Sequence, residues 1–474
     1  MSDTTAQSHP LSPAAQQVRP TIEADIDTIF DQLTDLVSFN SPRGAEGNLP
    51  AAEWVKEQFE TLGFTVELVP AVDGTRVLLG HRGPTATDDS TAADAPTITL
   101  YAHYDVVPAQ GEWATDPFTL TKRATAASHW TERWYGRGAA DCKGNVIAHL
   151  AAIRALDELG GTRANINLII EGSEEVGGEG LDHLIETEPE RFASDMYLIV
   201  DSGNAATGVP TLTSSLRGGG QIDVTVTTLK SPAHSGSFGG PAPDAVFALI
   251  RALNSLRDEA GYVRIDGLPS DQVWEGYQYD EEAFTADAGL VDGAQVIADA
   301  DNTIASQLWS RVAVSITGFT STPVAEAVNA VPATATARVN FRVPPGLTAD
   351  EVQKAICEHI AAHMPWGAHV EFAVSEAADP FSARMDGPLT LVLAESMGAA
   401  YAESTSGTFP RVEQVGMGGS IPLTTTLIEA HPHAELALYG CEDPQANIHS
   451  PNESVDPTEI IATAATTAIF LLSV

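Results

Sequence analysis

The stretch TITLYAH, residues 97–103, is a run of largely apolar residues that ends in a histidine. INLIIEG at 166–172 and MYLIVDSG at 196–203 are similar, with apolar residues on consecutive rather than alternating positions. This pattern is expected for strands that are buried on both faces of a sheet. Between the first two stretches, GNVIAHLAAIRALDELGG at 144–161 has the spacing of an amphipathic helix and ends in glycines. This order of strand, helix and strand predicts an α/β fold on a mixed or parallel sheet.

A different order of elements begins near residue 213. Strand patterns and two helical patterns follow one another as β-α-β-β-α-β, which is typical of a small ferredoxin-like α+β domain. From about residue 378 the α/β pattern returns and continues to the end of the chain. We therefore predict a catalytic domain in two pieces, 20–212 and 378–474, with a second domain inserted at 213–377. The acidic, irregular stretch 257–309 is expected to add a loop or helix to the insert. The segments that define the insert are QIDVTVTT (221–228), DAVFALIRALNSL (244–256), RVAVSITGF (311–319), ATARVNFRV (335–343), DEVQKAICEHIAAH (350–363) and HVEFAV (369–374).

Helices are expected near both ends of the chain. After a disordered head, TIEADIDTIFDQLTDLVSF at 21–39 has helical spacing, with Thr21 as a plausible N-cap. IIATAATTAIFLLSV at 460–474 is the most apolar run, but threonines interrupt it and it falls short of the ~18 apolar residues of a membrane span. We expect it to be a buried terminal helix.

Composition narrows the possible partners and location. The 474 residues carry 24 Lys and Arg against 64 Asp and Glu, a formal net charge of −40. Such a charge opposes binding to nucleic acid or to an anionic membrane surface. The three cysteines are too few and too scattered for a disulfide framework or a cysteine-based zinc site. With no secretory signal pattern at the N-terminus, the expected location is the cytoplasm.

Polar side chains follow the predicted strands of the catalytic domain where each strand ends. Carboxyl ends of parallel strands meet at one edge of a sheet, which is where open α/β sheets bind ligands. Asp105 is two residues beyond His103 and can accept a hydrogen bond from the second ring nitrogen of that histidine. The polar residues at this edge are His103, Asp141 in the turn before the long helix, Glu174 and Glu175, Asp201, and His449 after LALYG.

Two histidines with three or four carboxylates form a ligand set that suits zinc, with cobalt or manganese as possible substitutes. The carboxylates would repel one another in one cleft unless cations neutralise them, and two divalent ions suffice where one does not. One carboxylate must then bridge two metals about 3.5–4 Å apart. Taken singly, each residue has a structural alternative, such as a helix N-cap for Asp141 or a solvated loop for Glu174 and Glu175.

These motifs together resemble the di-zinc exopeptidase family that includes carboxypeptidase G, succinyl-diaminopimelate desuccinylase, aminoacylase and the carnosine-type dipeptidases. The resemblance covers nearly the whole chain, and GRGAADCKG, GGSIP and HSPNE are most similar to the dipeptidase branch. Cys142 departs from the Asp or Asn that such proteins often have there. The motifs that carry the resemblance are YAHYDVVP (101–108), GRGAADCKG (136–144), EGSEEVGG (171–178), DSGN (201–204), RGGGQIDVTV (217–226), AHSGSFGG (233–240), NAVPATATARVNFRVPPG (329–346), GMGGSIP (416–422) and HSPNE (449–453).

The resemblance implies a zinc-exopeptidase-like catalytic domain and a lid domain through which two chains dimerise. It implies that one metal binds His103, Asp141 and Asp201, that the other binds Asp141, Glu175 and His449, and that Glu174 is the general base. It also implies a cis peptide between Asp141 and Cys142. On the lid side, the resemblance assigns the substrate carboxylate to Asn329, Arg342 and amides near Gly419, and it implies that His234 reaches the active site of the other subunit.

The predicted function is metal-dependent hydrolysis of the amide bond of dipeptides or similar small substrates with a free carboxylate. An N-acyl amino acid or succinyl-diamine amidohydrolase would use the same metal chemistry, so the sequence leaves this alternative open. A non-catalytic metal-storing or scaffold dimer is a third reading, which the presence of Glu174 disfavours because no metal requires it.

Overall fold

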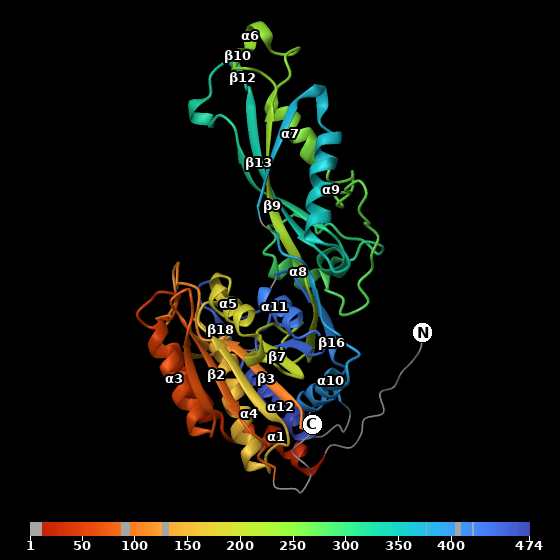
Figure 1. The fold of residues 1–474 in the computed structure, drawn as a ribbon. Coiled ribbons are helices and arrows are strands. Elements are labelled where there is room, and N and C mark those ends of the chain that lie inside the picture. Colours follow the sequence, from red (N-terminus) through yellow and green to blue (C-terminus); the bar gives the residue numbers. More distant parts are fainter. Residues whose placement is uncertain (1–11, 87–94, 126–131, 376, 403–408, 420) are drawn as a thin grey trace. The chain divides into compact units, whose positions relative to one another are not determined.

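The computed structural model describes residues 12–86, 95–125, 132–375, 377–402, 409–419 and 421–474. The chain forms two compact units (Figure 1). The first comprises Met1–Ser214, Ala383–Val415 and Ile421–Val474, and the second comprises Ser215–Ser382 and Gly416–Ser420. The second unit interrupts the first, and the short segment 416–420 groups with the second unit.

A mixed sheet forms the centre of the first unit. Strands β6, β3, β7 and β17 pair with one another in parallel, while β1, β2 and β8 add antiparallel pairs at the two sides. The predicted α/β fold class is confirmed. Every residue of β7 and nearly every residue of β3 is buried, as their consecutive apolar residues require. The strand order is β1 (Thr65–Pro70), β2 (Arg76–Arg82), β6 (Asn165–Glu171), β3 (Thr97–His103), β7 (Met196–Val200), β17 (Glu435–Tyr439) and β8 (Thr211–Leu216), and β15 (Phe381–Ser382) and β16 (Glu413–Met417) also pair with β8.

Helices from distant parts of the sequence pack together beside this sheet. The C-terminal helix α12 contacts α1, α4 and α10, and α2 contacts α4. Nearly all of α12 is buried, which confirms the predicted buried terminal helix. No helix among the described residues is long and apolar enough to cross a membrane. The bounds are α1 (Pro13–Ala24), α2 (Ile26–Val37), α4 (Lys143–Glu158), α10 (Pro388–Ala400) and α12 (Pro457–Ser473).

The predicted N-terminal helix start was wrong. Helix α1 begins at Pro13, and the Ser12 hydroxyl caps it by accepting a hydrogen bond from the Ala15 amide. Pro20 lies inside α1 rather than before a helix. Ala15, Val18 and Ile22 of α1 are buried at helical spacing, so packing stabilises the helix despite the proline.

Smaller elements complete the first unit. Helix α3 (Asn48–Thr61) packs on β1 and β2, and α5 (Glu179–Thr187) packs on α11 (Pro422–Ala430). A small antiparallel sheet contains β4 (Thr121–Ala124), β5 (Glu132–Tyr135) and β18 (Ser454–Val455).

The second unit has the predicted ferredoxin-like order of elements. Its antiparallel strands lie in the order β11, β13, β9, β14, with helices α7 and α9 on one face (Figure 1). Inward residues of β9 and β13 pack against the apolar faces of both helices. The bounds are β9 (Gly218–Thr227), α7 (Ala245–Asn254), β11 (Ala313–Thr320), β13 (Thr334–Val343), α9 (Ala349–Ala362) and β14 (His369–Val374).

Two additions extend the second unit. At one end of the long strands, β10 (Ala233–His234) pairs with β12 (Ala330–Val331) beside the short helix α6 (Ser235–Phe238), as Figure 1 shows. The stretch 257–309, predicted to add a loop or helix, contains α8 (Glu281–Asp287) and most of a single π-helical turn, Ser306–Ser310.

Candidate metal centre

The predicted polar residues meet at one edge of the central sheet. His103 is the last residue of β3, and Asp201 follows the last residue of β7. The two strands are parallel neighbours, so their carboxyl ends lie at the same edge. Asp141 reaches this edge from the turn before α4, and its peptide bond to Cys142 is cis, as predicted.

Asp141 lies between two histidines. Its Oδ1 is 3.0 Å from His103 Nε2, and its Oδ2 is 3.0 Å from His449 Nε2. On the first side, Asp201 Oδ1 is 3.3 Å from the same His103 nitrogen, and on the second side Glu175 Oε2 is 2.8 Å from His449 Nε2. The five side chains therefore form two groups of three that share the Asp141 carboxylate.

Asp105 contacts the His103 ring and the backbone of Glu174 and Glu175. Its carboxylate and carbonyl oxygens lie 3.3 and 3.1 Å from His103 Nδ1. Its carboxylate also accepts hydrogen bonds of 3.2 Å from the backbone amides of Glu174 and Glu175. Asp105 is fully buried, so these contacts fix both the histidine ring and the turn that carries the two glutamates.

Glu174 stands beside this shared set. Its Oε2 is 3.9 Å from His103 Nε2, which is farther than the oxygens of Asp141 and Asp201. Burial, followed by the charge of Asp201, raises the pKa of Glu174 to about 9. A carboxyl group that is close to the cluster but outside its shortest contacts is placed to exchange a proton with a small molecule bound there.

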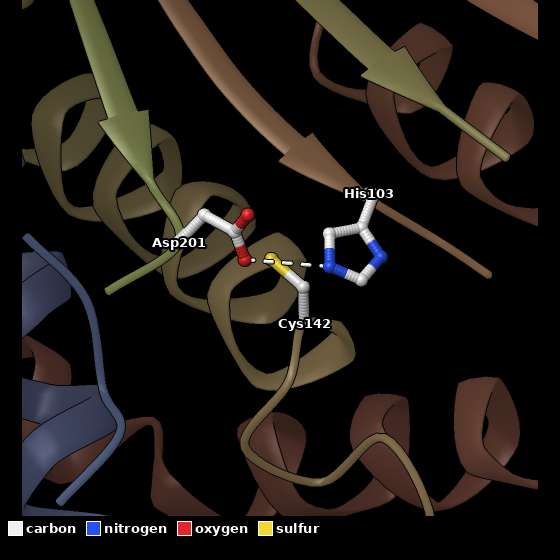
Figure 2. Close-up of side chains that lie close together, drawn as sticks. All are labelled: His103, Cys142 and Asp201. Atoms are coloured by element: carbon white, nitrogen blue, oxygen red, sulfur yellow. Dashed lines mark ion pairs between the residues drawn. The ribbon is translucent and has the colours of Figure 1, made fainter. Parts of the chain in front are cut away.

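Cys142 also lies in this region, and Figure 2 shows its sulfur between His103 and Asp201. The thiol donates a hydrogen bond of 3.3 Å to the carbonyl oxygen of Val200. Burial, followed by the charge of Asp201, raises the pKa of the Cys142 thiol well above its ordinary value. Because metal ligation requires the thiolate, this environment favours a packing role for Cys142.

The cluster fits divalent cations. The Nε2 atom of His103 faces oxygens of both Asp141 and Asp201, and a single proton on that nitrogen cannot point at both. Burial alone would raise the pKa of Asp141, yet hydrogen bonds from His103 and His449 hold it well below its ordinary value. Imidazole nitrogens and carboxylate oxygens that converge in this way are the ligands that zinc and related metals take.

Sequence reasoning missed two buried glutamates here. Glu442 lies close to Asp141 and Asp201, and burial followed by the Asp141 charge raises its pKa well above the usual range. Glu453 accepts hydrogen bonds from the amides of Gly138, Ala140 and Asp141 and from the Arg137 guanidinium. It thereby holds the turn that presents Asp141. Two features of the sequence could have identified them. Glu442 lies three residues after the end of β17, and Glu453 is the last residue of the HSPNE motif.

The second unit carries the other predicted site residues, and it separates them into two places. The exposed residues His234 and Asn329 lie together, and the Asn329 carbonyl accepts a hydrogen bond of 2.9 Å from the Ser235 amide. Arg342 is near the far end of β13, eight residues of strand beyond Thr334, which corresponds to roughly 26 Å. Gly419 is exposed, and a side chain there would meet open space. Within one chain, Asn329 therefore does not join Arg342 around a single carboxylate.

A mixed α/β sheet with candidate histidine and carboxylate ligands at its carboxyl edge is an arrangement expected of a metal-dependent hydrolase. The model of peptidase family M20/M25/M40 matches residues 99–473, and the chain belongs to this family. The predicted family resemblance is thus confirmed, and the protein is an enzyme of the metallopeptidase type.

Individual relatives agree with this assignment. The cysteinylglycine-S-conjugate dipeptidase of Corynebacterium striatum is 46% identical over 454 residues, which cover 94% of this chain and 95% of that protein. The crystal structure of human carnosine dipeptidase 1 matches with a TM-score of 0.73 at 23% identity, covering 98% of this chain and 99% of that one. A dinuclear metal-binding M20 peptidase from Bacillus subtilis matches with a TM-score of 0.58 at 13% identity, over 95% and 99% of the two chains. The two structures share the fold of this protein.

Proposed function

We propose that this protein hydrolyses the amide bond of dipeptides that have a free C-terminal carboxylate, using two divalent metal ions. The observation that carries the proposal is the Asp141 carboxylate, whose two oxygens each lie 3.0 Å from a different histidine. The name of the 46% identical relative points to S-substituted cysteinylglycine as the first substrate to test.

In the proposed centre, His103, Asp141 and Asp201 would hold one ion, and Asp141, Glu175 and His449 would hold the other. Zinc suits this mixture of nitrogen and oxygen ligands best, and cobalt or manganese can replace it. Each ion would have three protein ligands, and Asp141 would contribute to both groups. When bound, two such ions polarise a carbonyl oxygen and lower the pKa of a shared water towards about 7.

Glu174 is the proposed general base. It takes a proton from the attacking water, and the resulting carboxylic acid then gives a proton to the leaving amine. Asp105 keeps Glu174 in place through the backbone hydrogen bond to its carboxylate. This role needs a carboxylate beside the ligand set rather than within it, which is where Glu174 lies.

The second unit supplies the proposed substrate contacts. Arg342 binds the substrate carboxylate through its planar guanidinium group, with amides near Gly419 adding hydrogen bonds. His234 donates a hydrogen bond to the oxyanion that forms during attack. Asn329 lies beside His234, so the two act at the same place.

A homodimer through the second unit would bring His234 and Asn329 of one chain to the substrate bound by Arg342 of the other. His234 and Asn329 lie at the opposite end of β13 from Arg342, so one chain does not present all three to one substrate. In a two-fold dimer each chain can lend His234 and Asn329 to its partner. Exposed apolar side chains on this unit support a subunit contact: Phe247 and Ile250 on α7 and Ile316 and Phe319 on the edge strand β11. We keep the cytoplasm as the proposed location, because the buried cysteines Cys142 and Cys441 are unpaired.

A substrate panel tests this function. The purified protein is assayed with added zinc or manganese on S-substituted cysteinylglycine, cysteinylglycine, carnosine, N-acetyl amino acids and N-succinyl diamines. We expect the dipeptides to give the highest kcat/KM and a chelator to abolish the reaction. Faster hydrolysis of an acetylated amino acid or a succinylated amine than of every dipeptide would instead make the protein an amidohydrolase.

A further inference from the structure

Two arginines on β13 have opposite surroundings. Arg338 is opposite Asp223 of β9 and forms a two-pronged ion pair with it, with distances of 2.6 and 2.7 Å. Arg342, on the same face four residues later, is opposite Gly219. Among the described residues, no carboxylate pairs with Arg342. The pairing of β9 with β13 thus gives the exposed Arg338 a counter-ion and gives the partly buried Arg342 none.

A second unpaired arginine lies close by. Arg217 is only 8% exposed, and its Nε and Nη1 atoms are buried without a hydrogen-bond partner among the described residues. Burial, followed by the charge of Arg342, lowers the pKa of Arg217 to about 10. Two neighbouring guanidinium groups without a counter-ion are unfavourable in a buried setting unless an anion joins them.

A glycine lies beside each of the two arginine side chains. A Cβ atom on Gly219 would lie 2.5 Å from the Phe341 carbonyl oxygen and 3.1 Å from Arg342 Cδ, and one on Gly418 would lie 3.2 Å from Arg217 Nη2. The Arg217 amide donates a hydrogen bond of 3.0 Å to the Met417 carbonyl, which holds the segment with Gly418 beside Arg217. The backbone is therefore kept free of side chains where the two cations lie.

We propose that Arg217 and Arg342 together form an anion site in the second unit and that its ligand is the C-terminal carboxylate of the dipeptide. This inference rests on the proposed function and adds Arg217 as a second residue that determines substrate specificity. Paired guanidinium groups would bind a planar carboxylate through several charge-assisted hydrogen bonds. A substrate without this carboxylate would leave both cations unpaired, so the site excludes peptide amides.

The kinetic experiment compares a dipeptide with its C-terminal amide, which has the same scissile bond. Removing one charge-assisted hydrogen-bonding group by Arg217→Met should raise KM for the dipeptide about 10- to 100-fold. The same change should leave kcat/KM for the amide within about threefold, because the amide lacks the carboxylate. Arg338→Met is the matched control, since it removes an arginine from the same sheet that already has a counter-ion. Equal losses on the dipeptide and on the amide would overturn the proposal.

A binding experiment separates this proposal from the proposed function. Calorimetry with sulfate as the probe should show one anion bound per chain in the wild type, weaker binding in Arg217→Met and unchanged binding in Arg338→Met. Equal sulfate binding in all three proteins would overturn the anion site even if dipeptides are cleaved. If Arg217→Met does not fold, Arg217→Lys is used instead, because it keeps the charge but loses the planar guanidinium group. We expect Arg217→Lys to lose affinity for the dipeptide and not for its C-terminal amide. Activation by sulfate on dipeptide and amide alike would mean that the site belongs to an inorganic anion and would also overturn the assignment.

Discussion

The histidine and carboxylate cluster of the first unit and the arginine pair of the second unit are opposites in charge. In the cluster, carboxylates of Asp141, Asp201 and Glu175 converge with two histidines and find no Lys or Arg ion pair among the described residues. In the pair, Arg217 and Arg342 lie together and find no carboxylate among the described residues. Each place therefore gathers side chains that lack an oppositely charged Lys, Arg, Asp or Glu partner among the described residues.

The contrast with ordinary ion pairs shows what this excess means. Buried Arg133 is matched by Asp443 at 2.8 Å, and buried Arg137 is matched by Glu453 at 2.6 Å. In these pairs each charge is matched by an opposite charge within the chain, so no ligand is needed to balance it. We propose that a ligand of opposite charge completes each place: cations for the cluster and a carboxylate for the arginines.

The largest expected effect separates catalysis from metal binding. Glu174→Gln removes the proposed general base and should lower kcat about 10²- to 10⁴-fold. Glu179→Gln is a matched control, because Glu179 is an exposed glutamate five residues later on the same segment. Initial rates on the best dipeptide measure the difference. A Glu174→Gln enzyme with near wild-type kcat would remove Glu174 from the mechanism.

The next effect tests whether the second unit acts on the partner chain. His234→Ala should lower kcat about 10²- to 10³-fold with unchanged metal content, because it removes an oxyanion donor. The exposed His369 of the same unit provides the control His369→Ala, which should keep its activity.

Mixing subunits shows in which chain His234 works. Equal amounts of His234→Ala and Glu174→Ala chains should regain about a quarter of wild-type activity after exchange, since about half the dimers are mixed and each has one intact site. The same two proteins assayed without exchange are the control. No recovery in a mixture shown to have exchanged would contradict action on the partner chain.

A smaller effect concerns the support of the bridging carboxylate. Glu453→Gln removes acceptors from the turn that presents Asp141 and should weaken metal affinity about 10- to 100-fold. Glu435→Gln is a fair comparison, because Glu435 is also a buried glutamate that accepts hydrogen bonds from backbone amides. Glu435 is the first residue of β17, at the end of the strand away from Glu442. Metal competition with a chelating dye measures both. Equal metal affinity in the two variants would mean that Glu453 has no special part in the centre.

Much of this arrangement could be predicted from sequence because the strands are short and strongly apolar. TITLYAH ends at His103 and MYLIV ends before Asp201, so knowing where the strands stop also placed the ligands at one edge. The order of strands and helices predicted the ferredoxin-like unit in the same way. Runs of consecutive apolar residues mark these strands in the sequence because both faces of each strand are buried.

The rest depended on contacts that periodicity does not encode. Glu453 and Arg217 act through loops and through residues distant in sequence, such as Gly138 and Gly418. The start of α1 was missed because the expected helix had its N-cap at Thr21, whereas α1 begins at Pro13 and runs through Pro20 with Val18 and Ile22 buried. The separation of Asn329 from Arg342 follows from the length of β13, which a family motif does not show.

Metal content tests the central claim most directly. Elemental analysis of the purified protein, and of Glu174→Gln purified beside it, counts divalent ions per chain. We expect about two ions per chain in both, because Asp141 bridges two ligand groups and Glu174 belongs to neither. One ion per chain in a fully active enzyme, or loss of an ion from Glu174→Gln, would contradict the account.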